Sequence, residues 1–108
     1  MDFPNDENGQ VLRRMHEHGD DLTKPRPIDF EHVLPNRHAA EAMARRSRDL
    51  GYETKIRRRG PLTRKRDVTC TRTLLPTHAA ITEAEGALAA IAYDLGGHED
   101  GWGCFQPA

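Results

Sequence analysis

The chain has 108 residues, of which 36% are hydrophobic and 31% are charged, and its formal net charge at pH 7 is −1. A chain of this length normally forms one hydrophobic core, so we expect a single domain over residues 1–108. No apolar run approaches the ~18 residues that span a bilayer, and the first residues lack the basic and apolar regions of an export signal, so we expect a cytosolic protein without a membrane segment.

The first predicted element is a helix over about residues 6–18. Asn5 or Asp6 can cap its start, and Gly19 ends it. Its apolar side is a narrow stripe of Val11, Leu12 and Met15. Because short isolated helices are only marginally stable in water, we expect this helix to pack against the rest of the protein.

A strand is predicted next, over about residues 28–34. Pro25 and Pro27 fix their own φ angles and disfavour helix in the residues before them, so the chain must leave the first helix extended. One side of the predicted strand carries Ile28, Phe30, His32 and Leu34, and the other carries Asp29, Glu31 and Val33. This alternation is typical of a half-buried strand, and we expect it at the centre of a sheet.

A second helix is predicted from a cap at Asn36 to Leu50, with Gly51 as its stop signal. Its apolar positions recur at steps of three and four: Ala39, Ala40, Met43, Ser47 and Leu50. A second strand follows, in which Tyr52, Thr54 and Ile56 alternate with charged residues. Gly60 and Pro61 then mark a turn.

A third strand is predicted over residues 68–74, rich in β-branched residues. Thr77 can cap a third helix that runs to about Leu95. Its apolar stripe consists of Ile81, Ala84, Leu88, Ile91, Ala92 and Leu95. The tail from Asp100 to Phe105 is long enough for one short last strand, with Trp102 and Cys104 on the same side.

This order of elements predicts an α+β fold, the ferredoxin-like βαββαβ sandwich, preceded by an additional N-terminal helix. Two right-handed crossovers give a four-stranded antiparallel sheet in the order 4-1-3-2, with both later helices on one face and a core over about residues 27–106. Cys70 and Cys104 would then lie about 10 Å apart across an intervening strand, too far for a disulfide.

The sequence carries only weak signals for catalysis. It has no glycine-rich phosphate loop, no nucleophile elbow and no His-Glu-x-x-His motif. The six histidines and two cysteines lack the paired spacing of a metal site. We therefore expect a protein that is not an enzyme and that needs neither a metal nor another cofactor.

The charges are segregated: residues 1–35 carry a net −4, residues 36–76 a net +8, and residues 77–108 a net −5. Such asymmetry can steer a partner, or it can reflect a fold that joins its own opposite charges. The most basic spot surrounds the Gly60–Pro61 turn and consists of Arg57, Arg58, Arg59, Arg64, Lys65 and Arg66. We call residues 57–66 the basic hairpin. It could attract RNA phosphates in a salt-sensitive, sequence-blind way, or it could be a solvated surface. The third strand has no aromatic residue, so the base-stacking platform of RNA-binding domains with this topology is absent.

Three stretches resemble a known family. They are Phe-Pro-Asn-Asp-Glu-Asn-Gly-Gln-Val-Leu-Arg-Arg at residues 3–14, Gly-Asp-Asp-Leu-Thr-Lys-Pro-Arg-Pro-Ile-Asp-Phe at residues 19–30, and Gly-Gly-His-Glu-Asp-Gly-Trp-Gly at residues 96–103. Together they are similar to the ribonuclease E inhibitor B family, also called regulator of ribonuclease activity B. The resemblance implies a ferredoxin-like fold and a non-catalytic protein that binds an endoribonuclease, ribonuclease E, and damps RNA decay.

The resemblance also singles out two connections. Its signature turns contain Gly19, Leu22, Lys24, Pro25, Gly101, Trp102 and Gly103. These residues can close the core or contact a partner. We expect four acids beside them, Asp20, Asp21, Glu99 and Asp100, to form an acidic rim that meets arginine-rich segments of the partner. RNA binding by the basic hairpin and a small-molecule sensor domain stay as alternatives, and the oligomeric state stays open.

Overall fold

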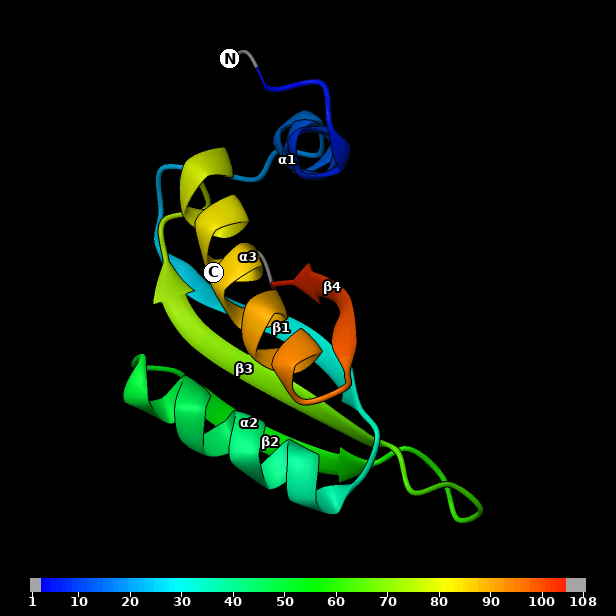
Figure 1. Cartoon of the computed structure of the whole chain (residues 1–108). Helices are drawn as coiled ribbons and strands as arrows, with labels where there is room; N and C mark the ends of the chain where they lie inside the picture. The colour runs from blue at the N-terminus through cyan, green and yellow to red at the C-terminus, as the bar shows by residue number, and fades with distance from the viewer. Residues whose placement is uncertain (1–2, 105–108) are drawn as a thin grey trace.

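A computed structural model of the chain describes residues 3–104 (Figure 1). In chain order its elements are α1 (Glu7–Glu17), β1 (Arg26–Leu34), α2 (Arg37–Asp49), β2 (Glu53–Arg58), β3 (Arg66–Leu74), α3 (His78–Asp94) and β4 (His98–Gly103). The fold is α+β, as predicted. None of the helices within these residues combines the length and the apolar character needed to cross a bilayer.

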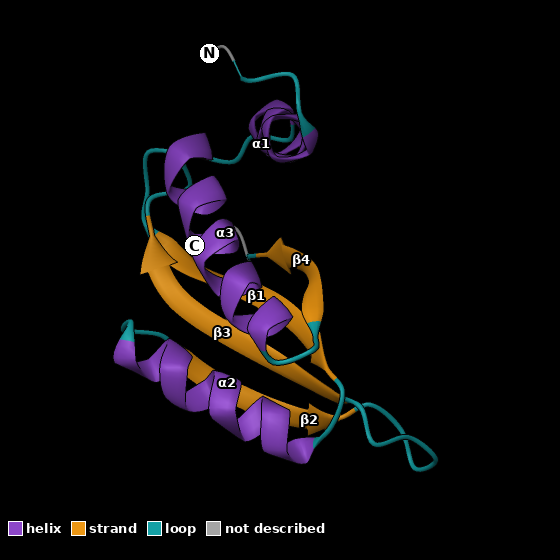
Figure 2. Ribbon diagram, viewed as in Figure 1, coloured by secondary structure: helices purple, strands orange, loops and turns teal. Residues whose placement is uncertain are grey.

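The four strands form one antiparallel sheet in the order β2-β3-β1-β4, which is the predicted order read from the opposite edge. β1 is central and pairs with β3 along its whole length. Helices α2 and α3 both cover the same face of this sheet, and α1 lies across the beginning of α3 (Figure 2). Among the described residues, no helix lies on the other face of the sheet.

The three helix starts confirm the predicted caps. The side chains of Asp6, Asn36 and Thr77 each accept a hydrogen bond from the backbone N–H three residues further on, at 2.8, 2.9 and 3.1 Å. The helices are followed by glycines with positive φ angles at Gly19, Gly51 and Gly96. Side chains rarely adopt this left-handed backbone, so glycine is the residue that ends each helix with least strain.

The core lies between the sheet and the two covering helices. Its fully buried side chains include Ile28, Phe30, Leu34, Val68 and Cys70 from the strands and Met43, Ile81 and Leu88 from the helices. Two positions on the predicted apolar sides, Leu50 and Ile56, are exposed and not buried. Leu50 follows the last turn of α2, and Ile56 lies on an edge strand. Arg72 has the phase of the buried residues of β3 but is exposed, and its guanidinium lies 5.5 Å from the ring centre of Tyr52.

Two strand boundaries differ from the prediction. β1 begins at Arg26, and Pro27 is tolerated in this central strand because β4 pairs with β1 only from Asp29 onward. β4 begins at His98, two residues before the predicted strand, and ends at Gly103. Cys104 follows it, and Phe105 lies outside the described residues. Both cysteines are free, and burial raises the pKa of the Cys70 thiol, as suits a small core residue.

Candidate functional site

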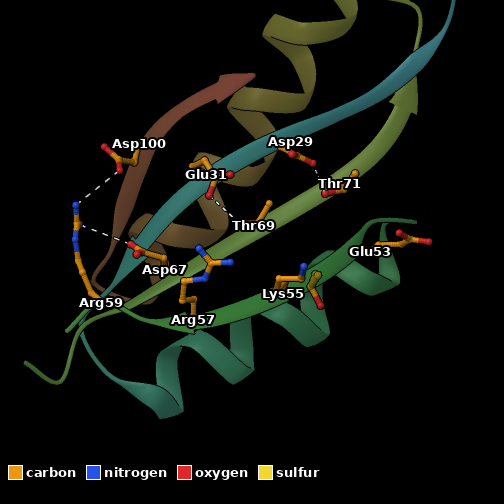
Figure 3. Close-up of a pocket in the computed structure, with 11 residues that line it drawn as sticks. Asp29, Glu31, Glu53, Lys55, Arg57, Arg59, Asp67, Thr69, Thr71 and Asp100 are labelled. Carbon is orange, nitrogen blue, oxygen red and sulfur yellow. Dashed lines mark hydrogen bonds and ion pairs between the residues drawn. The ribbon is translucent and has the colours of Figure 1, made fainter. Parts of the chain in front are cut away.

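The uncovered face of the sheet is polar and hollowed. Figure 3 shows side chains from β1, β2 and β3, together with Arg59 and Asp100, around a depression of about 470 Å³. Its lining residues are Asp29, Glu31, Glu53, Thr54, Lys55, Arg57, Arg59, Asp67, Thr69, Thr71 and Asp100. We call this surface the open face. Its lining within residues 3–104 includes no aromatic ring and consists of charged and hydroxyl groups.

Two carboxylates at the centre of the open face are held by threonine hydroxyls. Thr71 Oγ1 donates a hydrogen bond to Asp29 at 2.6 Å, and Thr69 Oγ1 donates to Glu31 at 2.7 Å. Each pair lies directly opposite in the β1–β3 register. Cross-strand contacts of this kind orient both carboxylates, which are half-buried, before any partner arrives.

Opposite charges from distant parts of the chain meet at one end of the open face. Arg59 lies 3.8 Å from the carboxylate of Asp67 and 3.9 Å from that of Asp100 (Figure 3). The base of the basic hairpin is therefore linked to β4. The fold thus joins some of its own segregated charges, although such exposed pairs contribute little stability.

Most of the basic hairpin remains unneutralised. In residues 3–104, Arg59 is the only one of its six cations with a carboxylate within 4.0 Å. The Arg66 guanidinium donates to the carbonyls of Arg64 and Lys65, at 2.6 and 3.3 Å. Leu62 at the tip is 99% exposed, and the loop projects beyond the sheet (Figure 1). The hairpin is a positive protrusion with an apolar tip.

The structure does not assemble the four acids of the expected rim on one surface. Asp20 is buried, and its two oxygens accept hydrogen bonds from Arg26 Nη1 at 2.7 and 2.6 Å. Asp21 is exposed in the connection between α1 and β1, and hydrogen bonds from the hydroxyl and backbone N–H of Thr23 lower its pKa.

The two acids of β4 both line a groove beside α1 and α3, and only Asp100 also reaches the open face. Glu99 pairs with His32 across the β1–β4 ladder and lines a groove with Asp6 and Glu85, between α1, α3 and β4. Asp100 also lines the open face, beside Arg59. Asp100 is therefore the residue of the expected rim that lies beside the central carboxylates.

The signature turns hold the fold together through contacts that local sequence does not reveal. Trp102 Nε1 donates to Asn8 Oδ1 at 2.9 Å, and Asn8 Nδ2 donates to Glu85 at 2.9 Å and to Thr82 at 3.1 Å. Asn8 thus ties α1 to both α3 and β4.

The stretch from Gly19 to Pro25 is organised around Arg26. Leu22 packs in the core, while Lys24 and Pro25 are exposed. The carbonyl of Lys24 accepts hydrogen bonds from Arg26 Nη2 and Nε at 3.2 and 3.3 Å. At the other connection, Gly101 has a φ of 92° in the irregular part of β4, and Gly103 lies opposite Asp29. The sequence indicated these turns but not the arginine that holds one of them.

His32 is the buried histidine of the central strand. It is 1% exposed, and its Nδ1 lies 3.3 Å from the carbonyl oxygen of Val68. Burial lowers the pKa of His32, opposed by the hydrogen bond with Val68 and by the nearby Glu99 carboxylate. The folded protein therefore keeps this imidazole neutral at a pH at which an exposed one takes up a proton.

Acidification from pH 7.5 to 5.5 should lower the free energy of unfolding by about 1 kcal/mol through His32 alone. The unfolded chain binds a proton at this residue below a pKa of about 6.5, whereas the folded chain does not until lower pH, so stability is full above that value and falls as the pH drops. Urea unfolding at several pH values measures the slope. The variant His32→Gln should flatten it, whereas His38→Gln, on the exposed side of α2, should leave it unchanged. An equal slope in wild type and His32→Gln would refute this assignment.

Within the described residues, no group of three or more His, Cys, Asp or Glu side chains could hold a metal ion. Comparison with known proteins gives one result for nearly the whole chain. The family model described as regulator of ribonuclease activity B, RraB, matches residues 5–104. No protein with a curated description matches the chain.

Proposed function

Because the chain belongs to the regulator of ribonuclease activity B family, we propose that it is a non-catalytic regulator that binds an endoribonuclease of the ribonuclease E type, or its RNA-degradation scaffold. Binding would modulate the rate of RNA decay. The observation that carries this proposal is the family match over residues 5–104. The match includes Asn8 and Trp102, whose contacts join α1 to α3 and β4, and Arg26, which holds the connection between α1 and β1.

The proposal includes the ferredoxin-like fold class and the acidic residues that would contact the partner. Strand order and helix placement support the ferredoxin-like class for this sheet. Of the expected acidic rim, Asp21, Glu99 and Asp100 would contact cationic groups of the partner, since arginine pairs well with carboxylates. Asp20 would take no part, because its carboxylate is engaged by Arg26 inside the protein.

The purified chain should slow cleavage of a fluorescent RNA by the endoribonuclease of its own organism. Because the proposed target is the enzyme and not the substrate, the chain should inhibit at concentrations comparable with that of the enzyme and far below that of the RNA. Cleavage rates at fixed enzyme and increasing chain concentration measure the effect. Unchanged cleavage at every chain concentration would rule out the proposed regulation. Inhibition that appears only when the chain is in excess over the RNA would point to RNA sequestration instead.

RNA binding is a second candidate function, and the unneutralised cations of the basic hairpin favour it. Reversing Arg58, Arg64 and Lys65 to glutamate should then abolish binding of a single-stranded RNA, measured by fluorescence anisotropy in ~50 mM salt. The logarithm of the wild-type affinity should fall with the logarithm of salt concentration, with a slope of about −0.7 per phosphate contacted.

A matched control reverses three cations elsewhere, Arg13, Arg14 and Arg45, on exposed positions of α1 and α2. This variant should bind RNA nearly as the wild type does. Equal losses in the two variants would show that net charge, and not the hairpin, attracts the RNA. If the wild type binds no RNA at low salt, the hairpin is a solvated surface.

A further inference from the structure

The central carboxylates of the open face are accessible from the β4 side. Gly103 lies opposite Asp29, and a Cβ atom built at Gly101 or Gly103 would meet no atom of residues 3–104 within 4 Å. A second hollow of about 340 Å³ lies there, lined by Asp29, Glu31, Asp100, Gly101, Trp102, Gly103 and Cys104. Threonine hydroxyls hold the carboxylates from one side, and glycine backbone leaves space on the other.

The open face also has a fixed order of charge across its strands. Glu31, Thr69 and Lys55 are successive partners in the β1–β3 and β3–β2 registers. A carboxylate, a hydroxyl and an ammonium group therefore form one row across β1, β3 and β2. The outer two groups are two strand spacings apart, about 10 Å. Lys55 has no carboxylate within 4.0 Å among the described residues, so its charge is free to meet a partner.

We propose that this row, with Asp29 beside it, docks a segment of the regulated ribonuclease that presents a cation and a carboxylate about 10 Å apart. The inference rests on the proposed function and adds the surface and the chemistry of the partner. Residues i and i+7 of one helix have this separation, about 10.5 Å, and lie on the same side after nearly two turns. The cation is best an arginine, because its guanidinium pairs with a carboxylate through two parallel hydrogen bonds.

The charges of the open face favour this occupant over RNA. Asp29 and Glu31 occupy the central strand, where they would repel a phosphate backbone. Among the described residues, the lining of the larger hollow includes no ring on which a base could stack, and the Trp102 ring beside the second hollow is tied to Asn8 in α1. A second copy of the chain would have to bury charges from both open faces, with no apolar centre to compensate for their desolvation. A protein segment with one charge of each sign leaves neither Glu31 nor Lys55 unpaired.

The first test measures binding of the full chain to the purified endoribonuclease by calorimetry. The variant Asp29→Asn with Glu31→Gln keeps acceptors for the threonine hydroxyls and should stay folded, and its affinity should fall at least about tenfold. Lys55→Gln should weaken binding as well. The control Asp49→Asn with Glu83→Gln removes the same charge from exposed helix positions and should bind like the wild type. Wild-type affinity in the first variant would overturn the inference while leaving the proposed function intact.

The second test does not need the ribonuclease. Backbone amide shifts of the chain are followed while a helical peptide with arginine at i and glutamate at i+7 is added, and the shifts should gather on β1, β3 and β2. A peptide with two arginines and one with two glutamates should bind at least threefold more weakly. If the chain binds this peptide through the open face but does not bind the ribonuclease, the surface stands and the proposed function fails. Three results would contradict the inference. All three peptides could bind equally, or a short RNA could cause the same shifts. The wild-type chain could also form a dimer that dissociates in the variant Asp29→Asn with Glu31→Gln.

Discussion

The replacement Asp20→Ala should lower the free energy of unfolding by about 3–5 kcal/mol, because it leaves a buried guanidinium without its counter-ion. The side chain of Arg26 is 2% exposed and that of Asp20 is 7% exposed. Other donors of Arg26 reach the carbonyls of Asp21 and Lys24, but these belong to the same connection that Asp20 anchors. The loss should therefore include loosening of the chain between α1 and β1. Urea unfolding followed by circular dichroism at pH 7 measures it.

Two further variants separate the buried charge from other causes. Asp21→Ala removes the neighbouring, exposed carboxylate and should cost no more than about 0.5 kcal/mol. Asp20→Leu combined with Arg26→Met replaces the ion pair by apolar side chains, and it should recover most of the stability lost in Asp20→Ala. Similar losses in Asp20→Ala and Asp21→Ala would show that the loop, and not the ion pair, determines the stability.

The order of elements could be predicted because each one carries its own local signal. β1 and α3 have clear periods of two and about 3.6 residues, and Asp6, Asn36 and Thr77 mark the helix starts by chemistry that acts over three residues. Sheet order then follows from rules of connection and handedness. The sequence pattern predicts the start of β1 at Ile28, two residues after its observed start at Arg26, although Arg26 is in phase with Ile28 and Phe30. An arginine in phase with buried residues was the available signal for a buried ion pair.

The candidate site was harder to predict because it depends on register. The alternation of β1 predicts Asp29 and Glu31 on the side of the strand away from the core, but no local signal indicates that Thr71 and Thr69 lie opposite them. The acidic rim was inferred from neighbours in sequence. In the structure Asp20 is buried, and Glu99 and Asp100 lie within β4 and not in the turn before it. The four acids therefore do not form one surface. Asn8 and Trp102 are 94 residues apart, and only the folded chain brings them together.

The replacement Gly97→Ala should lower the free energy of unfolding by about 3 kcal/mol, at the upper end of the cost of overpacking. A Cβ atom at this position would lie 2.3 Å from the Val33 carbonyl oxygen and 3.2 Å from Leu34 Cα. Both are backbone atoms of the central strand, which β3 holds along its whole length, so they cannot move away cheaply. The start of β4 must detach instead. Thermal unfolding measures the loss.

Two other glycines show why the cost depends on what the new atom meets. Gly86 lies within α3 with nothing within 4 Å of its Cβ position, so Gly86→Ala should stabilise the protein by about 0.5–1 kcal/mol. At Gly9 the Cβ would lie 1.8 Å from the Pro4 carbonyl oxygen, a closer clash. Pro4 is exposed and precedes α1, where no strand pairing holds the backbone, so it can move at the cost of the packing of its neighbour Phe3 against the core. Gly9→Ala should therefore cost less than Gly97→Ala. A larger loss in Gly9→Ala would mean that the segment before α1 is held as firmly as the central strand. In Gly97→Ala alone the displaced β4 should also carry Asp100 away from Arg59 and weaken binding at the open face.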